Sequence, residues 1–299
     1  MFNISAPPKV SIIMPTYNRA AYIGETIESI RRQTYACWEL IIVDDGSDDN
    51  TEEIISNIGD DRIQFHKAGR LGVGSKIKNL GLEKATGEFI AFIDSDDLWA
   101  PAKLEKQLIA LHQYPEAGFS LTGGYNFRSA GAPLEYFYQQ RDGIRYGNVF
   151  FGFFRSEVAA TTPTLILRKE CLQATGGFKD TKPLSDLDFI LNLANTFNAV
   201  ILFEPLFYRR LHNTNYSSLH WAKRQHQGLE MIRSYKNLLP RELISESLYK
   251  SYINFGEHYL LHNENAKAIY QFFNAWKYNS FSVVPLKKIA KAILLAFKK

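Results

Sequence analysis

Short apolar runs and amphipathic stretches alternate through the first part of the chain. Runs rich in β-branched residues are typical of buried strands and span residues 10–15, 38–47, 62–67 and 88–97. Apolar residues at helical spacing predict helices over 20–33, 51–58, 75–85 and 101–113. This alternation predicts an α/β fold with a largely parallel sheet covered by helices on both faces.

Local signals support these helices. Ile23, Ile27 and Ile30 repeat at the spacing of one helical face. Thr51 is placed to cap the helix 51–58, and Pro101 suits the first turn of the helix that follows it.

The pattern changes after residue 114. Strands are predicted over 118–127 and 162–172, the latter running into a helix, and a helix that opens with acids over 184–197. Residues 199–212 indicate a strand, a turn and a further extended piece. From about residue 222 only helices are predicted, including a hairpin over 254–279 and a final amphipathic helix over 285–299.

These elements predict one domain over 1–220, in which the pattern changes between 9–113 and 114–220, and a helical region over 221–299. The formal net charge of the chain is +4, but residues 1–100 carry 10 Lys/Arg against 16 Asp/Glu, and residues 222–299 carry 13 against 5. The basic residues gather in a helical tail without a groove-reading motif, which argues against nucleic-acid binding.

The composition of the chain indicates which class of protein to expect. With 45% hydrophobic residues the chain is expected to be globular, and no run approaches the ~18 apolar residues of a membrane span. The N-terminus lacks the pattern of a signal peptide. Cys37 and Cys171 form no metal-ligand spacing, so we expect two small core residues in a reducing cytosol.

Polar clusters follow three of the predicted strands. "PTYN" (15–18), "DDGS" (44–47) and "DSDD" (94–97) would meet at one sheet edge, where ligands of parallel sheets bind. Three carboxylates within "DSDD" repel one another unless a positive charge lies among them. Oxygen ligands at a strand end suit Mg²⁺ or Mn²⁺, although an acidic turn in solvent would show the same residues.

Taken together, these segments resemble a known family. "VSIIMPTYNRAAYIGETIESIRRQTY", "WELIIVDDGSDDNT", "NLGLEKATGEFIAFIDSDD" and "GGF" are similar to the inverting glycosyltransferases of family 2, over residues 9–217. The resemblance implies a catalytic domain over 1–220 with the GT-A fold, in which residues 9–113 bind the nucleotide and residues 114–220 the acceptor. It also implies a nucleotide-diphosphate sugar as donor and a bound Mn²⁺ or Mg²⁺.

The resemblance also implies roles for residues around the nucleotide. Pro15, Thr16 and Tyr17 would line the base and ribose. Asp45 would accept a hydrogen bond from the uracil N3–H if the donor is a UDP-sugar. Lys78, where many relatives have Arg, would reach the nucleotide.

The resemblance implies a different role for each carboxylate of "DSDD". Asp94 would contact the ribose, and Asp96 would ligate the metal that bridges the diphosphate. Asp97 would have a structural role. His212 in "YRRLHNTNYS" would be a metal or diphosphate contact.

An inverting transfer also needs a base that takes the proton of the acceptor hydroxyl. The family places Glu-Asp after "GGF", and the corresponding stretch here is "SDLDF" (185–189), so Ser185 replaces the first acid. Asp186 is therefore the candidate base and Asp188 the alternative. The same acids could simply complement the dipole of a helix N-terminus.

The sequence thus predicts a metal-dependent glycosyltransferase that acts on a glycan or lipid-linked acceptor in surface polysaccharide synthesis. A nucleotidyltransferase would need a Gly-rich loop that is missing here, and a dinucleotide oxidoreductase lacks G-x-G-x-x-G. A degenerate member that binds without turnover stays open. We expect a cytoplasmic protein whose basic helix 285–299 contacts an anionic membrane or packs on protein.

Overall fold

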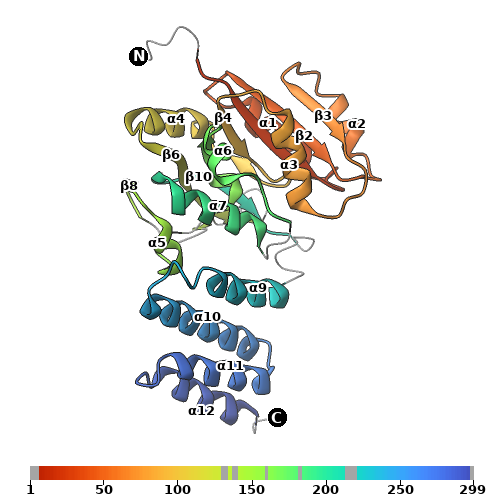
Figure 1. The fold of residues 1–299 in the computed structure, drawn as a ribbon. Coiled ribbons are helices and arrows are strands. Elements are labelled where there is room, and N and C mark those ends of the chain that lie inside the picture. Colours follow the sequence, from red (N-terminus) through yellow and green to blue (C-terminus); the bar gives the residue numbers. More distant parts are fainter. Residues whose placement is uncertain are drawn as a thin grey trace. The chain divides into compact units, whose positions relative to one another are not determined.

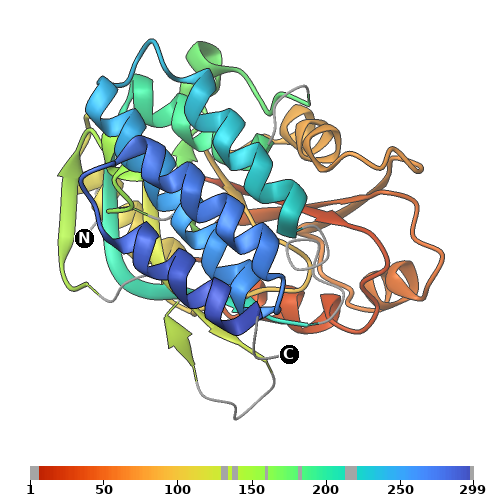
Figure 2. The same cartoon turned by 90° about the horizontal axis from the view of Figure 1, so that it is seen from below.

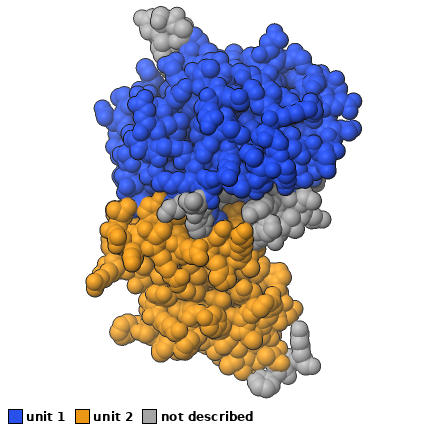
Figure 3. Space-filling model, turned by 45° about the vertical axis from the view of Figure 1, so that its right-hand side comes forward, with its two compact units in different colours: residues 1–150, 159–215 blue, residues 151–158, 216–299 orange. Residues whose placement is uncertain are grey.

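The computed structural model describes residues 7–128, 134–136, 141–158, 161–180, 184–212 and 221–296. The chain divides into two compact units, one of residues 1–150 and 159–215 and one of residues 151–158 and 216–299 (Figure 3). The short segment 151–158 therefore belongs with the helical unit, although it lies inside the range 114–220 that the sequence indicates as an acceptor half.

A mixed sheet forms the centre of the first unit (Figure 1). Its strands follow the order β3-β2-β1-β4-β9-β6-β10-β5, with β7 paired to β6 and β8 paired to β10. Their bounds are β1 (Val10–Thr16), β2 (Trp38–Asp44), β3 (Ile63–Lys67), β4 (Phe89–Phe92), β5 (Leu98–Trp99), β6 (Ala117–Phe127), β7 (Glu135–Tyr136), β8 (Ile144–Gly147), β9 (Ile166–Arg168) and β10 (Asn198–Arg210).

The parallel arrangement predicted for the first four strands is confirmed. β3, β2, β1 and β4 are all parallel neighbours, so their carboxyl ends share one edge of the sheet. β9 runs antiparallel to both of its neighbours, β4 and β6, so β6 runs in the same direction as β4. The prediction for 162–172 is right in part, because a 3₁₀ turn (Thr162–Thr164) precedes this short strand.

The turn predicted within 199–212 is wrong. β10 is one continuous strand of 13 residues, and it pairs with β6 on both sides of Pro205. Two register shifts between Leu202 and Phe207 absorb the proline, which has no N–H to donate to the ladder. The strand therefore continues to Arg210 and delivers the following residues to the carboxyl edge of the sheet.

Helices surround this sheet. In the first unit they are α1 (Ile23–Arg31), α2 (Thr51–Ser56), α3 (Gly74–Lys84), α4 (Lys103–Gln113), α6 (Cys171–Thr175) and α7 (Ser185–Thr196), while α5 (Phe150–Phe154) spans the boundary between units. Thr51 does not cap α2 as predicted. It is the first helical residue, and its hydroxyl accepts a hydrogen bond from the Arg19 N–H.

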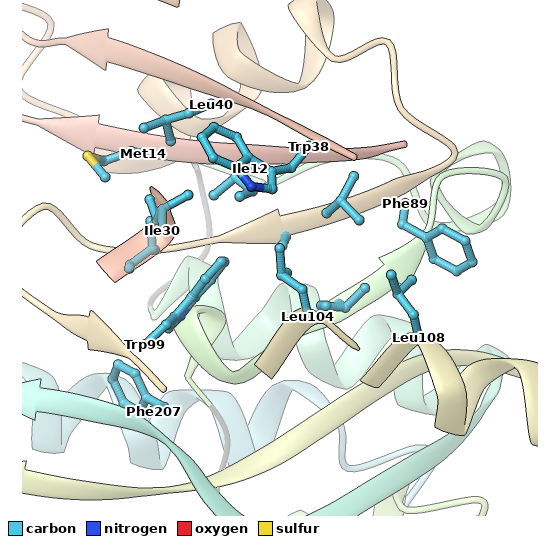
Figure 4. Close-up of a cluster of buried hydrophobic side chains, with 14 of the residues drawn as sticks. Ile12, Met14, Ile30, Trp38, Leu40, Phe89, Trp99, Leu104, Leu108 and Phe207 are labelled. Carbon is cyan, nitrogen blue, oxygen red and sulfur yellow. The ribbon is translucent and has the colours of Figure 1, made fainter. Parts of the chain in front are cut away.

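Apolar side chains from both the sheet and its helices make the core (Figure 4). Ile12 and Met14 of β1 lie beside Leu40 of β2, since alternate strand residues point to the same face. Ile30 of α1 and Leu104 of α4 pack against them. Cys171 is buried as predicted, whereas Cys37 is only half-buried.

The second unit consists of helices. These are α9 (Trp221–Ser234), α10 (Arg241–Leu261), α11 (Asn265–Tyr278) and α12 (Val284–Ala296), each packed on the next (Figure 2). The hairpin predicted within 254–279 is confirmed, with its turn at residues 262–264. Gly256 allows α10 to approach α11 closely, because a Cβ there would lie 2.3 Å from the Phe272 ring.

One carboxylate ties the start of the sheet together. Glu39 is buried on β2, where Ser11 Oγ donates to it from β1 at 2.5 Å and the Thr86 N–H donates to it at 2.8 Å. Lys9 Nζ lies 2.7 Å from its other oxygen. Burial alone would raise the pKa of Glu39, but the hydrogen bonds from Lys9, Ser11 and Thr86 outweigh it and lower the pKa to about 2.

We predict that Glu39→Gln lowers the free energy of unfolding by about 1–3 kcal/mol at pH 7. Because the folded-state pKa lies below the unfolded value, the contribution of Glu39 is complete above about pH 4.5 and is lost as the pH falls towards 2. Urea unfolding from pH 7 to pH 2.5 should therefore show the gap to wild type closing below about pH 4.5. Glu28→Gln, at a partly exposed side chain, is the control, and a gap that stays constant with pH would contradict this account.

Candidate functional site

The three polar segments meet at the carboxyl edge of the sheet, as predicted. Thr16 at the end of β1 is in register with Asp44 at the end of β2, and β4 is parallel to β1 on its other side. Asp44 builds the turn that follows its strand, because its carboxylate accepts from the N–H groups of Gly46 and Ser47 at 3.1 and 2.9 Å. That turn leaves Asp45 as the carboxylate directed to the next loop.

Asp45 is held by the loop that follows β3. Its oxygens accept from the N–H groups of Leu71 at 2.6 Å and Gly72 at 3.0 Å, and from the Arg70 guanidinium. The same guanidinium lies 3.7 Å above the ring of Tyr17. Asp45 and Tyr17, both predicted to contact the base, are thus brought together under one arginine.

Two further predicted base and ribose residues lie beside this pair. Pro15 is in β1, in register with Val43 of β2. Thr16 is buried, and its hydroxyl oxygen has no hydrogen-bond partner among the described residues. A buried hydroxyl without a partner is costly, so its position at this edge fits a ligand that completes the pairing.

Asp96 and His212 come together although 116 positions separate them in the chain. His212 Nε2 lies 3.0 Å from Asp96 Oδ2, and its ring stacks on Tyr22 with 4.7 Å between centroids. Arg19 Nε lies 3.2 Å from the same oxygen. The carboxylate that is predicted to ligate a metal is therefore held by two nitrogen groups.

The residues present fit a divalent cation that shares its coordination with a substrate. In the described part of the chain no three His, Cys, Asp or Glu side chains converge as a complete metal cage. Mg²⁺ and Mn²⁺ need no such cage, because they are commonly held by one or two carboxylates together with substrate phosphates and water. Asp96 would supply the oxygen ligand and His212 the adjacent nitrogen.

The other two acids of this loop have raised pKa values. Burial raises the pKa of Asp94 to about 6, against the opposing effect of the Lys78 ammonium. Burial also raises the pKa of Asp97 well above its ordinary value, and Asp94 and Asp96 add to the rise. Asp97 accepts a hydrogen bond from the Arg210 N–H at 2.9 Å, which matches the structural role predicted for it.

Lys78 connects this acidic loop with the predicted base. Its side chain is 6% exposed, and Nζ lies 2.7 Å from both carboxylate oxygens of Asp186. Burial would lower the pKa of Lys78, but Asp186 and Asp94 outweigh it and raise the pKa. The ammonium that was expected to reach the nucleotide is thus directed to the candidate base.

The two candidate bases differ in exposure. Asp186 lies in the first turn of α7 with its side chain 44% exposed, while Asp188 is buried. A carboxylate offers about four acceptor positions, so Asp186 can keep its pairing with Lys78 and still accept a proton from solvent or substrate. The greater accessibility of Asp186 favours it as the base.

Trp99, which follows the acidic loop, lies in the core, where its Nε1–H donates to the Pro163 carbonyl at 3.0 Å.

Three arginines of the site were not predicted as site residues. Arg19 and Arg70 hold Asp96 and Asp45, as described above. Arg210 donates from Nε to the Asp96 carbonyl at 2.9 Å and from Nη2 to Glu25 at 2.6 Å. No spacing rule marks these positions, because each arginine reaches its partner from a separate loop or strand end.

Comparison of the sequence with known proteins identifies the family of this chain. The family model described as "Glycosyl transferase family 2" matches residues 11–155. The glycosyltransferase TuaG of Bacillus subtilis, named for teichuronic acid biosynthesis, is 32% identical over 217 residues, which cover 72% of this chain and 83% of TuaG. The chain belongs to glycosyltransferase family 2.

Other members of the family share shorter regions. WfgD of Escherichia coli, named as a UDP-Glc:alpha-D-GlcNAc-diphosphoundecaprenol beta-1,3-glucosyltransferase, is 44% identical over 99 residues, or 33% of this chain and 39% of WfgD. The prediction of a glycosyltransferase is confirmed, and the matched relatives include proteins of cell-surface polysaccharide synthesis.

Solved structures confirm the GT-A fold. TarS of S. aureus, in complex with UDP-GlcNAc, superposes with a TM-score of 0.65 at 19% identity, covering 90% of this chain and 81% of that one. The mannosyltransferase PcManGT of Pyrobaculum calidifontis, in complex with GDP-Man and Mn²⁺, gives a TM-score of 0.58 at 20% identity and covers 99% and 89% of the two chains.

We predict that Lys78→Met lowers the free energy of unfolding by about 1–3 kcal/mol at pH 7, because it removes the cation that most lowers the pKa of Asp94. The loss should shrink towards pH 5, where Asp94 is protonated. Lys78→Arg keeps the positive charge and serves as the control. Urea unfolding of the variants at pH 7 and pH 5 checks this, and an equal loss in both variants would show that shape and not charge matters here.

Proposed function

We propose that this chain is a metal-dependent inverting glycosyltransferase that moves a sugar from a UDP-sugar to a hydroxyl of a glycan or lipid-linked acceptor. The observation that carries the proposal is the pair of Lys78 and Asp186 beside Asp94. It places a half-exposed carboxylate next to the acidic loop that is expected to hold the donor diphosphate. Such a carboxylate can act as the general base of a single displacement.

Each residue of the site has a task in this reaction. Asp186 would take the proton of the acceptor hydroxyl as that oxygen attacks the anomeric carbon of the sugar. Lys78 would fix the orientation of Asp186 through its two short contacts. When bound at Asp96 and His212, a Mn²⁺ or Mg²⁺ ion would neutralise the charge that develops on the leaving diphosphate.

The donor is proposed from both the site and the relatives. Asp45, Tyr17 and Thr16 form one group at the sheet edge and suit the stacking and hydrogen bonding of a nucleobase. WfgD is named for UDP-Glc, and the TarS structure holds UDP-GlcNAc. PcManGT holds GDP-Man, so a guanine nucleotide is the competing donor.

Support for acceptor binding comes from β6. Thr122 and Asn126 lie on one face of this strand, and each has a buried side-chain oxygen without a partner among the described residues. Asn126 is in register with Arg209 of β10, whose positive charge acts on both Asp94 and Asp97. Hydroxyl groups of an acceptor sugar would supply hydrogen-bond partners for these oxygens.

We propose that the reaction takes place in the cytoplasm, because the two cysteines are free and the proposed donor is a nucleotide sugar.

We predict that Asp186→Asn retains nucleotide binding but lowers sugar transfer by at least about 100-fold, as loss of a general base typically does. UDP release from UDP-glucose and from UDP-N-acetylglucosamine measures turnover, and the anomeric configuration of the product tests inversion. Asp188→Asn is the companion variant. Normal turnover in Asp186→Asn with a large loss in Asp188→Asn would move the base to Asp188, and no turnover by wild type would favour a chain that binds without catalysis.

A further inference from the structure

The end of the chain combines positive charge with exposed apolar side chains. Residues 265–299 contain seven lysines and no Asp or Glu. Ten of the eighteen large apolar side chains that are exposed among the described residues lie between Leu261 and Leu295. Either feature alone would be ordinary, but the two coincide in the last helices of the second unit.

The packing of α12 explains why apolar groups remain outside. Pro285 and Ala292 are its buried residues, and the helix packs on α11. The larger residues Leu286, Ile293 and Leu294 are exposed on the rest of the helix. α12 therefore packs on protein, as one of the two sequence interpretations held, but it does so without burying its main apolar surface.

The turn before α12 extends this surface. Phe281 is 98% exposed, and Val283 and Val284 beside it are also exposed. Lys287 and Lys291 are exposed one turn apart on α12, and no described carboxylate forms an ion pair with either. We call the following set the α12 face: Phe281, Val283, Val284, Leu286, Lys287, Lys291, Ile293, Leu294 and Leu295.

We infer that the α12 face docks the protein on an anionic lipid bilayer. Apolar side chains on a helix flanked by lysines suit the boundary between headgroups and acyl chains, where the lysines reach lipid phosphates. None of the described helices is long and apolar enough to cross a membrane, so the contact would lie on the surface. The inference rests on the proposed function in one respect, since a lipid-linked acceptor is presented at such a surface.

Charge argues against a second copy of the chain as the occupant. A two-fold interface places the same patch against itself. Lys287 and Lys291 would then lie on both sides of the interface, and the α12 face contains no acid to pair with them. An anionic bilayer offers the complementary charge that a second copy lacks.

Co-sedimentation of the full chain with vesicles tests the inference without donor or acceptor. We expect binding to vesicles of phosphatidylcholine mixed with phosphatidylglycerol, weak binding to phosphatidylcholine alone, and release at high salt. Lys287→Gln with Lys291→Gln should lower the partition coefficient by about thirtyfold. Lys223→Gln with Lys236→Gln removes two exposed lysines of the same unit outside the face and should leave binding within about twofold of wild type.

The apolar part has its own pair of variants. Phe281→Asn with Leu294→Asn should lower the partition coefficient at least tenfold, because both side chains lose their transfer into the bilayer. Leu238→Asn changes an exposed leucine of the same unit outside the face and is the control. All the substituted side chains are exposed, and circular dichroism would verify that each variant is folded.

Three results would overturn the inference. These are equal binding to neutral and anionic vesicles, equal binding by the α12 and control variants, and self-association without vesicle binding that Leu294→Asn abolishes. Nucleotide binding by wild type, measured separately, distinguishes failure of this inference from failure of the proposed function. A chain that binds nucleotide but no vesicles would refute the docking alone.

Discussion

The three carboxylates that follow β4 are the constraint on which the site depends. Asp94, Asp96 and Asp97 repel one another, and burial raises the pKa of both Asp94 and Asp97. Cations from elsewhere in the chain make the arrangement possible. Lys78 comes from α3, Arg19 follows β1, and the end of β10 supplies a guanidinium and an imidazole. The acidic loop is thus surrounded by positively charged and nitrogen-containing side chains from several elements of the first unit. A bound divalent cation would neutralise the remaining negative charge of its carboxylates.

The fold makes these contacts possible over long distances in the sequence. Parallel strands bring the ends of β1, β2 and β4 to one edge, and the bulged course of β10 carries Arg210 and His212 to the same edge past Pro205. The first turn of α7 then places Asp186 against Lys78. The proposed general base, the acidic loop and the residues proposed to bind the nucleobase therefore lie at one edge of the sheet, although no local segment contains more than one of them.

The sequence predicts much of this, and its limits have physical reasons. Strand ends and "DSDD" follow from hydrophobic period and residue type, and the pairing of Asp96 with His212 agrees with the family resemblance. The contacts of Arg19, Arg70 and Arg210 depend on tertiary positions that no periodicity encodes. The continuity of β10 was missed because a proline usually ends a strand, and the exposed face of α12 depends on which stripe packs on α11.

The central claim is that "DSDD" holds a cation that binds the donor diphosphate. Calorimetric titration of UDP, GDP and dTDP, each with Mn²⁺ and with EDTA, tests it most directly on wild type and Asp96→Ala. The account predicts that UDP binds in the presence of Mn²⁺ and that EDTA or Asp96→Ala abolishes this binding. Binding of UDP that is equally tight with EDTA or in Asp96→Ala would contradict it, as would failure of all three nucleotides to bind the wild-type chain.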